Sequence, residues 1–315
     1  MSSMDVAPQF KHFSIRPATP TIGGTIEGLH LSELTDESAA ELRAALWHYG
    51  VLFAPSQHLS FDQMKAVAYR FGDQLEKHSF GKTLADQGHP EVLLIERLQS
   101  DKAKTTADIW HHDVSARANP NIMSILQAEV VPFGADTMWS SATAAFDRLP
   151  FALKQLFLNI DIDHDTLYLM LRHDFGDASM AIEKIAGLRE SSTHPAVIDH
   201  PFTGRPTLFV GNGYVKRVHG YTAELSELIL KIASEMTKVP ELQVRHQWQP
   251  GDVALWDNFG TVHYGVTADL GDQVRRLHRV AAWSPSVRPS LDRDRAMRAL
   301  VAPRVEPGLR AVGAR

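Results

Sequence analysis

Apolar residues along the 315-residue chain recur with two different periods. Over residues 35–50 and 225–236 they return every three or four positions, which predicts two amphipathic helices. A further helix is predicted after Ser60, because Ser60 and Gln63 form a capping-box pair ahead of an apolar helix face. Short apolar runs indicate strands over residues 21–29, 51–54, 92–95, 122–126, 253–256 and 277–283.

Two segments have a less regular pattern. From Phe146 to about Ile185 the chain looks more helical and looser, so it is either a lid over a pocket or a helical insert at the surface. Residues 284–315 carry seven arginines against three acidic residues and are rich in proline and alanine. This tail is either a solvated, mobile end or a strap over the body. We therefore expect one domain over residues 1–283, followed by a basic C-terminal tail.

The composition limits the chemistry that the chain can perform. It has 16 histidines and no cysteine, which excludes disulfides, thiolate zinc sites, iron–sulfur clusters and cysteine nucleophiles. A metal would have to be bound by imidazole and carboxylate groups. A net charge of −5 argues against a nucleic-acid-binding protein. The first residues hold no apolar signal-peptide region, and no apolar run approaches the roughly 18 residues of a membrane span. We expect a cytoplasmic protein that binds neither nucleic acid nor membrane.

The most informative segment runs from Ile109 to Val114 and is flanked by residues that favour strands. If the segment is a strand, His111 and Asp113 point to one face and His112 points to the other. An imidazole beside a carboxylate could supply two of the three ligands of a 2-His-1-carboxylate iron site. A hydrogen-bonded structural pair is the alternative, because such pairs are common on strands.

A third ligand would have to come from a distant part of the sequence. His263 offers one, since it follows a predicted strand and a turn. In a strand that begins at about Arg275, Arg275, Leu277 and Arg279 share one face. Two guanidiniums facing a metal site require an anion, because an unpaired buried charge is costly. A dicarboxylate co-substrate would fit, since arginine forms bidentate hydrogen bonds with carboxylates. Surface arginines on an edge strand are the alternative.

These residues lie in motifs that follow one another as they do in a known family. The sequence resembles the taurine/aryloxyalkanoate dioxygenase (TauD/TfdA-like) family of Fe(II)- and 2-oxoglutarate-dependent oxygenases over the chain up to the basic tail. The matching motifs are Trp110-His111-x-Asp113-Val114, Pro132-Phe-Gly-Ala-Asp136-Thr137, Trp256-Asp257-Asn258 with His263-Tyr264, Arg275 with His278-Arg279, and the N-terminal segments Gly23–Leu29, Gly50–Phe53, Gln57–Ser60 and Arg70-Phe71-Gly72.

The resemblance implies a mainly β fold with flanking helices, a double-stranded β-helix of the jelly-roll, cupin-like type. It implies that His111, Asp113 and His263 bind Fe(II), with no catalytic residue beyond these ligands. The implied reaction uses O2 and 2-oxoglutarate to hydroxylate a C–H bond of a small organic substrate, releasing succinate and CO2. The carboxylate at Asp113 favours hydroxylation, because related halogenases carry a small residue in its place.

The resemblance also implies how the co-substrate and substrate are bound. The far carboxylate of 2-oxoglutarate would contact Thr137 and Arg275, and Arg279 would lie near its 1-carboxylate. The residues expected to contact the substrate are His78, Val114, Tyr214 and Arg279.

Two positions depart from the taurine enzymes, which carry asparagine at Ala107 and tyrosine at Gly81. These departures favour a larger organic anion than taurine, such as a sulfonate, sulfate ester, aryloxy acid or natural-product acid. Two other functions use the same residues: a zinc hydrolase, and a non-catalytic jelly-roll protein that binds an anion. Neither accounts for Thr137 together with Arg275 equally well. A homo-oligomer would suit the family.

Overall fold

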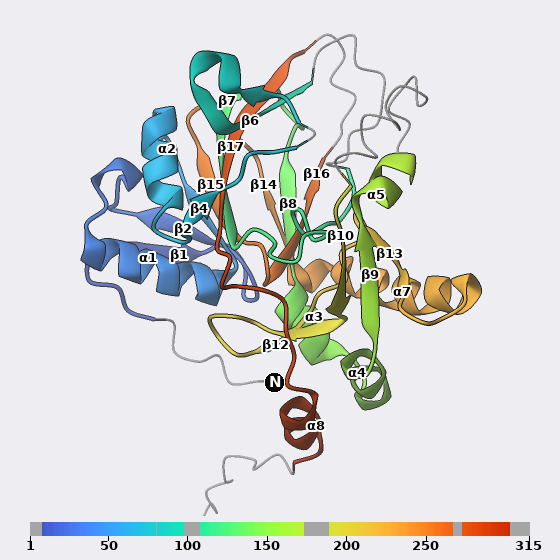
Figure 1. The fold of residues 1–315 in the computed structure, drawn as a ribbon. Coiled ribbons are helices and arrows are strands. Elements are labelled where there is room, and N and C mark those ends of the chain that lie inside the picture. The colour runs from blue at the N-terminus through green and yellow to red at the C-terminus, as the bar shows by residue number, and fades with distance from the viewer. Residues whose placement is uncertain (1–7, 80, 98–107, 173–188, 267–272, 303–315) are drawn as a thin grey trace, which may run out of the picture.

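A computed structural model describes residues 8–79, 81–97, 108–172, 189–266 and 273–302. Within them the chain forms a β core with helices at its periphery (Figure 1). The larger sheet has the strand order β1-β2-β3-β15-β7-β17-β6-β5, with β4 also paired to β17. The bounds of these strands are Ser14–Pro17 (β1), Gly24–Glu27 (β2), Val51–Ala54 (β3), Gln74–Leu75 (β4), Thr83–Leu84 (β5), His89–Arg97 (β6), Met123–Val130 (β7), Val253–Asp257 (β15) and Arg275–Trp283 (β17).

A second sheet, β14-β8-β16, faces the larger one, and the two make the jelly-roll. Its antiparallel strands are Thr137–Ser141 (β8), Gln243–His246 (β14) and Thr261–Gly265 (β16). Two smaller sheets lie outside this pair: β10-β9-β13 and the hairpin β11-β12. Their strands are Asp161–Asp165 (β9), Ser191–Pro195 (β10), Val197–Asp199 (β11), Pro206–Leu208 (β12) and Val215–Val218 (β13).

Helices cover two regions of the β core (Figure 1). Helices α1 and α2 lie against the larger sheet. Helices α3, α4, α7 and α8 gather at one end of the molecule. The helix bounds are Asp36–Tyr49 (α1), Phe61–Ala68 (α2), Ala142–Arg148 (α3), Phe151–Leu158 (α4), Thr166–Arg172 (α5), Ala223–Thr237 (α7) and Arg293–Val301 (α8). Among the residues that the structure describes, no helix is both long and apolar enough to cross a membrane.

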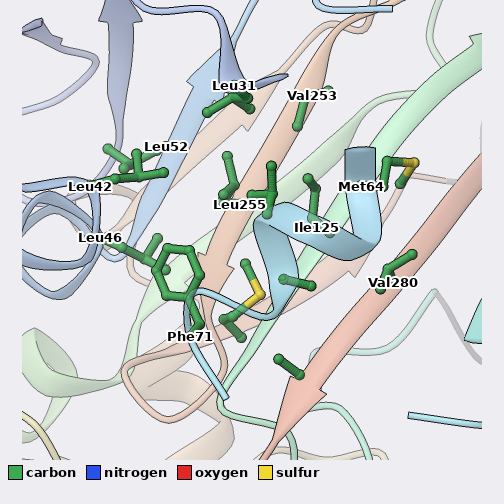
Figure 2. Packing of buried hydrophobic residues seen from close by; sticks show 14 of the residues in the cluster. Leu31, Leu42, Leu46, Leu52, Met64, Phe71, Ile125, Val253, Leu255 and Val280 are labelled. Atoms are coloured by element: carbon green, nitrogen blue, oxygen red, sulfur yellow. The ribbon is translucent and has the colours of Figure 1, made fainter. Parts of the chain in front are cut away.

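The main hydrophobic cluster lies between α1, α2 and the larger sheet, as Figure 2 shows. Leu42 and Leu46 of α1 and Met64 of α2 are completely buried there. They meet side chains from the strands, including Leu255 and Val280. Burying such side chains contributes about 1.5–3 kcal/mol each to folding. This packing anchors the strands whose other face lines the space between the two sheets.

A second cluster fills that space and is dominated by Trp139 and Trp256, whose ring centroids are 5.9 Å apart. Strand β17 contributes to both clusters, because Leu277 points between the sheets while Val280 points toward the helices. Arg279 is also buried, two residues beyond Leu277. The alternation predicted for this strand is therefore confirmed.

The strongly periodic segments fold as predicted. The helices over residues 35–50 and 225–236 appear as α1 and α7. The strands at residues 51–54 and 253–256 are present within one residue of their predicted ends, those at 92–95 and 277–283 lie inside longer strands, and the one at 122–126 begins one residue later and continues to Val130. Ser60 and Gln63 form the predicted capping box of α2. The glycine-interrupted strand over residues 21–29 is reduced to β2, because its first residues form a turn closed by the Thr19 hydroxyl.

The segment that begins at Phe146 is less helical than predicted. It contains α4 and α5, but strand β9 lies between them. In β9 the buried residues are Ile162, His164 and Asp165, and Ile162 is the only apolar residue of the strand, so the alternation is easy to overlook. The rest of this segment, residues 173–185, lies outside the described part of the chain, so the choice between a lid and a surface insert stays open.

The basic tail is a strap as far as Ala302. Helix α8 is capped at its N-terminus by Asp292, whose side chain accepts a hydrogen bond from the Arg295 N–H. Ala296 is buried in the cluster that includes α4, and Arg293 donates hydrogen bonds to the Leu158 carbonyl (3.1 Å) and to Asp161 (2.6 Å). The solvated alternative does not hold for this part, while residues 303–315 lie outside the description.

Candidate metal centre and co-substrate pocket

Two distant histidines are brought together by their backbones. His111 and His263 form an isolated antiparallel bridge, with N–H···O distances of 3.0 Å in both directions. Their ring centroids are 4.1 Å apart. The prediction that residues 109–114 form a strand is wrong beyond this single bridge, because the chain enters a turn at Asp113. The turn nevertheless directs the Asp113 carboxylate toward both imidazoles.

The three side chains present one donor atom each to a common point. Asp113 Oδ1 lies 3.8 Å from His111 Nε2 and 3.7 Å from His263 Nε2, and all three donor atoms are within 4.8 Å of one another. His111 Nδ1 is 2.6 Å from the Ile109 carbonyl oxygen, so it carries the proton and donates it there. The lone pair of His111 Nε2 is therefore directed to the centre. This donor set fits a divalent transition metal.

The electrostatics of the cluster favour metal-binding protonation states. Burial lowers the pKa values of His111 and His263, so both imidazoles are neutral at neutral pH. Burial on its own would raise the pKa of Asp113, but the Arg279 guanidinium, together with a hydrogen bond from Ser124, holds it below its usual range. Asp113 is therefore a carboxylate. Neutral imidazoles and an ionised carboxylate are the forms that ligate metals.

Asn258 fixes the backbone of the turn. Its Oδ1 accepts a hydrogen bond from the Asp113 N–H (2.7 Å), and its Nδ2 donates to the carbonyls of Asp113 (3.0 Å) and Asn121 (2.9 Å). As predicted, His112 points away from the centre and bonds within the fold, to the Asn258 carbonyl at 2.8 Å. Gly211 packs against His112, and a Cβ at Gly211 would lie only 2.8 Å from the backbone nitrogen of His112. The amide and this close approach hold the turn in place.

Arg279 lies between two buried carboxylates. One of its terminal nitrogens is hydrogen-bonded to Asp113 Oδ1, and the other donates to Glu76 Oε2 at 2.8 Å. The second oxygen of Asp113 accepts a 2.8 Å hydrogen bond from Ser124. Arg279 thus contacts the candidate metal ligand directly.

Arg275 lies in the same cavity as the three donor atoms and has a different environment. Its nearest polar contacts are the Ala135 carbonyl (3.4 Å) and the Thr137 hydroxyl (3.5 Å). Among the described residues, no carboxylate lies within 4.0 Å of its guanidinium. Burial and the nearby Arg97 lower the pKa of Arg275 to about 10. A largely buried cation without a carboxylate partner is costly, so this part of the pocket favours an anion.

One cavity of about 270 Å³ joins these groups. The candidate metal donors lie on its wall, together with Thr137, Arg275 and Arg279. Apolar side chains complete the lining. The apolar residues of the wall that the structure describes include Leu93, Leu94, Leu126, Leu169 and Trp256. A few polar groups within a mostly apolar wall are typical of small-molecule sites.

Three of the four predicted substrate contacts line this cavity, namely Arg279, His78 and Tyr214. His78 Nδ1 accepts a 2.8 Å hydrogen bond from the Gly81 N–H, and burial lowers the pKa of His78, so its Nε2 carries the proton. Tyr214 is buried, and burial raises the pKa of its phenol, which stays protonated. A Cβ at Gly81 would lie 2.3 Å from Leu93 Cδ1, so the tyrosine of the taurine enzymes would not fit without rearrangement. Ala107 lies outside the described residues.

Val114 occupies an unusual backbone conformation. Its φ of 45° lies in the left-handed region, which β-branched residues rarely adopt. The side chain is buried and follows Asp113 directly. Such strain is retained where the surroundings impose it, and it often marks a functional site.

A family model described as "Taurine catabolism dioxygenase TauD, TfdA family" matches residues 14–281. The chain belongs to this family. It is 33% identical over 289 residues to an alkylsulfatase of Acinetobacter baylyi, covering 86% of this chain and 84% of that protein. It is 32% identical over 294 residues to an alpha-ketoglutarate-dependent sulfate ester dioxygenase of Pseudomonas putida, covering 89% and 92%.

Solved structures support the same assignment. A taurine dioxygenase from Burkholderia xenovorans superposes with a TM-score of 0.71 at 29% identity, covering 87% of this chain and 91% of that one. The fold is also shared with AAD-2, solved with Mn(II) and N-oxalylglycine (TM-score 0.72, 24% identity, 89% and 99% covered). The predicted jelly-roll and the predicted enzyme class, a 2-oxoglutarate-dependent dioxygenase, are thereby confirmed. Members of this class use 2-oxoglutarate and O2 with a metal.

Glu76 was not predicted as part of the site. It lies two positions before His78 in an extended segment, so both side chains point to the same side. The two-residue spacing from His78 could have indicated that Glu76 belongs to the site. It was not used, because an acidic residue on a loop is usually solvated. Asn258 belonged to a recognised motif without an assigned role.

Proposed function

We propose that this chain is an iron(II)- and 2-oxoglutarate-dependent hydroxylase of a small organic anion, releasing succinate and CO2. The chain is similar to an alkylsulfatase, a sulfate ester dioxygenase and, at 28% identity, a phenoxypropionate dioxygenase of Sphingobium herbicidovorans. A sulfate ester, a sulfonate or an aryloxy acid is therefore the proposed class of substrate.

The proposed metal ligands are His111, Asp113 and His263. Two neutral imidazoles and one carboxylate on a single side leave other coordination positions open, which suits non-haem iron(II) better than a closed structural site. Bound iron and 2-oxoglutarate would supply the oxidising chemistry, and the protein supplies binding, orientation and exclusion of water. Asn258 keeps the Asp113 backbone in place for this purpose.

The proposed site of the 2-oxoglutarate side-chain carboxylate is Arg275 with Thr137. The observation that carries the proposal is the position of this guanidinium, in one cavity with the three donor atoms and without a carboxylate partner among the described residues. The Thr137 hydroxyl accepts a 2.9 Å hydrogen bond from Trp248, so its own proton is free to be donated to a carboxylate. Arg279, beside Asp113, is proposed to contact the 1-carboxylate.

The proposed substrate contacts are His78, Val114, Tyr214 and Arg279. His78 Nε2–H and the Tyr214 hydroxyl offer hydrogen bonds to an anionic head group, and the leucines of the wall suit an apolar chain or ring. Val114 is buried and follows Asp113 directly. This combination of polar and apolar groups favours an amphiphilic substrate over taurine.

The test of this function uses purified protein under anaerobic conditions. Addition of Fe(II) and 2-oxoglutarate is expected to produce a weak visible charge-transfer band, which His111→Ala abolishes. With O2, succinate release is then measured over sulfate esters, sulfonates, aryloxy acids and amino-acid derivatives. The absence of a band, with His111→Ala indistinguishable from the parent, would reject the assignment. The cytoplasmic location and a homo-oligomeric state stay predictions.

A further inference from the structure

We propose that Glu76 determines substrate specificity, by restricting the Arg279 side of the pocket to head groups that carry one negative charge. The proposal rests on the proposed function, because it concerns the substrate end of the same cavity. Glu76 belongs to none of the motifs described above. Its proposed effect is that the site distinguishes two classes of ester of similar shape, singly charged sulfates and doubly charged phosphates.

The backbone holds Glu76 beside the strand that carries Arg279. β4 pairs with the end of β17, and the Glu76 N–H donates a 2.8 Å hydrogen bond to the Ala281 carbonyl. The Glu76 side chain is only 3% exposed. Its Oε2 accepts hydrogen bonds of 2.8 Å from both Arg279 and Asn121. Its position is therefore set by the sheet and by two donors.

Without substrate, the positive charge of Arg279 is therefore already shared between two carboxylates. Its guanidinium faces Asp113 on one side and Glu76 on the other. Arg117 also approaches Glu76, at 3.4 Å, but Glu190 holds Arg117 more closely, at 2.9 and 3.0 Å. Glu76 therefore acts mainly on Arg279. Arg275 differs, because no carboxylate among the described residues forms an ion pair with it, although the nearby Asp136 acts to raise its pKa.

The other polar groups at this end offer hydrogen bonds and little charge. His78 has a pKa lowered by burial, and the Tyr214 phenol stays protonated. A sulfate or sulfonate can spread its single charge over its oxygens and accept these hydrogen bonds together with one from Arg279. A second negative charge would lie close to the Arg279–Glu76 pair, and Arg117, the other cation beside Glu76, is already bound to Glu190. The added repulsion is therefore unfavourable in a site of low dielectric constant.

The experiment compares hexyl sulfate with hexyl phosphate, which carries close to two charges at pH 8 because its second pKa is about 6. Binding to the Mn(II)–N-oxalylglycine complex of the full chain is measured by titration calorimetry. We expect the wild-type protein to prefer the sulfate by about tenfold or more, the scale of one additional charge repulsion in a partly screened site. Glu76→Gln keeps the hydrogen-bond acceptor and removes the charge, so it should reduce this preference by at least about fivefold.

Two controls separate charge from shape. Glu190→Gln removes a carboxylate from the same network that does not contact Arg279, and it should leave the preference unchanged. Hexyl methyl phosphate has a phosphate centre but one charge, and the wild-type protein should bind it more tightly than hexyl phosphate. This second comparison needs no variant, so it also applies if Glu76→Gln fails to fold.

Several results would overturn the proposal. These are an equal preference in the wild-type protein and in Glu76→Gln, no binding of any of the three esters to either protein, or wild-type rejection of the methyl diester as strong as that of the dianion. Binding of N-oxalylglycine is measured first, in the same cell. Its absence would mark a failure of the proposed function, whereas normal N-oxalylglycine binding without a charge preference would mark a failure of the role given to Glu76.

Discussion

Replacement of Arg275 by lysine is the most direct test of the co-substrate pocket. Lysine keeps the positive charge but loses the planar fork that can donate two parallel hydrogen bonds to one carboxylate. In the structure, only the Thr137 hydroxyl and the Ala135 carbonyl lie within hydrogen-bond reach of the guanidinium among the described residues, at 3.5 and 3.4 Å. An incoming carboxylate would therefore be the principal partner of Arg275.

The expected loss follows from this environment. Replacement of a charged, two-point contact by a single one removes one charge-assisted hydrogen bond, which is worth about 1.5–3 kcal/mol when buried. This corresponds to a roughly 10- to 150-fold weaker affinity for 2-oxoglutarate. Because lysine keeps the positive charge and the Arg275 guanidinium has no carboxylate ion-pair partner among the described residues, the replacement should change the free energy of unfolding of the metal-free protein little.

The affinity is measured by anaerobic titration of 2-oxoglutarate into the Fe(II) protein, followed through the visible charge-transfer band. Arg276→Lys is the matched control. Arg276 is the next residue on β17, and its guanidinium pairs with Glu96 (2.7 Å) and Glu129 (3.1 Å). The Arg276→Lys variant should bind 2-oxoglutarate with the same affinity as the parent protein. An unchanged affinity in Arg275→Lys, or an equal loss in both variants, would refute the assignment of Arg275.

Three further predictions test the surroundings of the candidate metal. Asn258→Ala leaves three backbone groups without their partner, so urea unfolding should show a loss of about 2–4 kcal/mol; a loss below about 1 kcal/mol would contradict this. Gly211→Ala should weaken Mn(II) binding roughly tenfold with an unchanged circular dichroism spectrum, because its Cβ would press on the His112 backbone; parent-like affinity would argue against it. Burial lowers the pKa of His164, which is neutral when folded, so the free energy of unfolding should be constant above the unfolded pKa of about 6.5 and fall below it. His164→Gln should reduce that slope between pH 6.5 and 5, and an identical slope would exclude His164 as a contributor.

Much of the fold could be predicted from local patterns. α1 and α2 begin at residues whose side chains cap them, Thr35 and Ser60, and α1 ends at Gly50 with a positive φ. The strands that were predicted correctly carry apolar residues on a buried face, but the second sheet, β14-β8-β16, was not predicted as a set of strands. β9 was missed because one of its two inward positions is His164, whose burial depends on neighbouring segments. A residue's own type does not carry that information.

The sequence by itself determined which residues were available for chemistry. The absence of cysteine left imidazole and carboxylate as metal ligands, and the two-residue periodicity of β17 placed Arg275 and Arg279 on one face. Those inferences need only composition and the geometry of a single strand, because both are local properties of the chain.

Only the tertiary structure decided what these residues meet. His111 was expected on a strand, yet a single bridge to His263 and a turn at Asp113 bring the three donors together. Arg275 and Arg279 share one face of β17 and look equivalent in the sequence, but Arg279 is paired with Glu76 whereas Arg275 has no carboxylate partner within the described residues. Contacts between segments far apart in the chain depend on how the two sheets pack, and no local pattern specifies that packing.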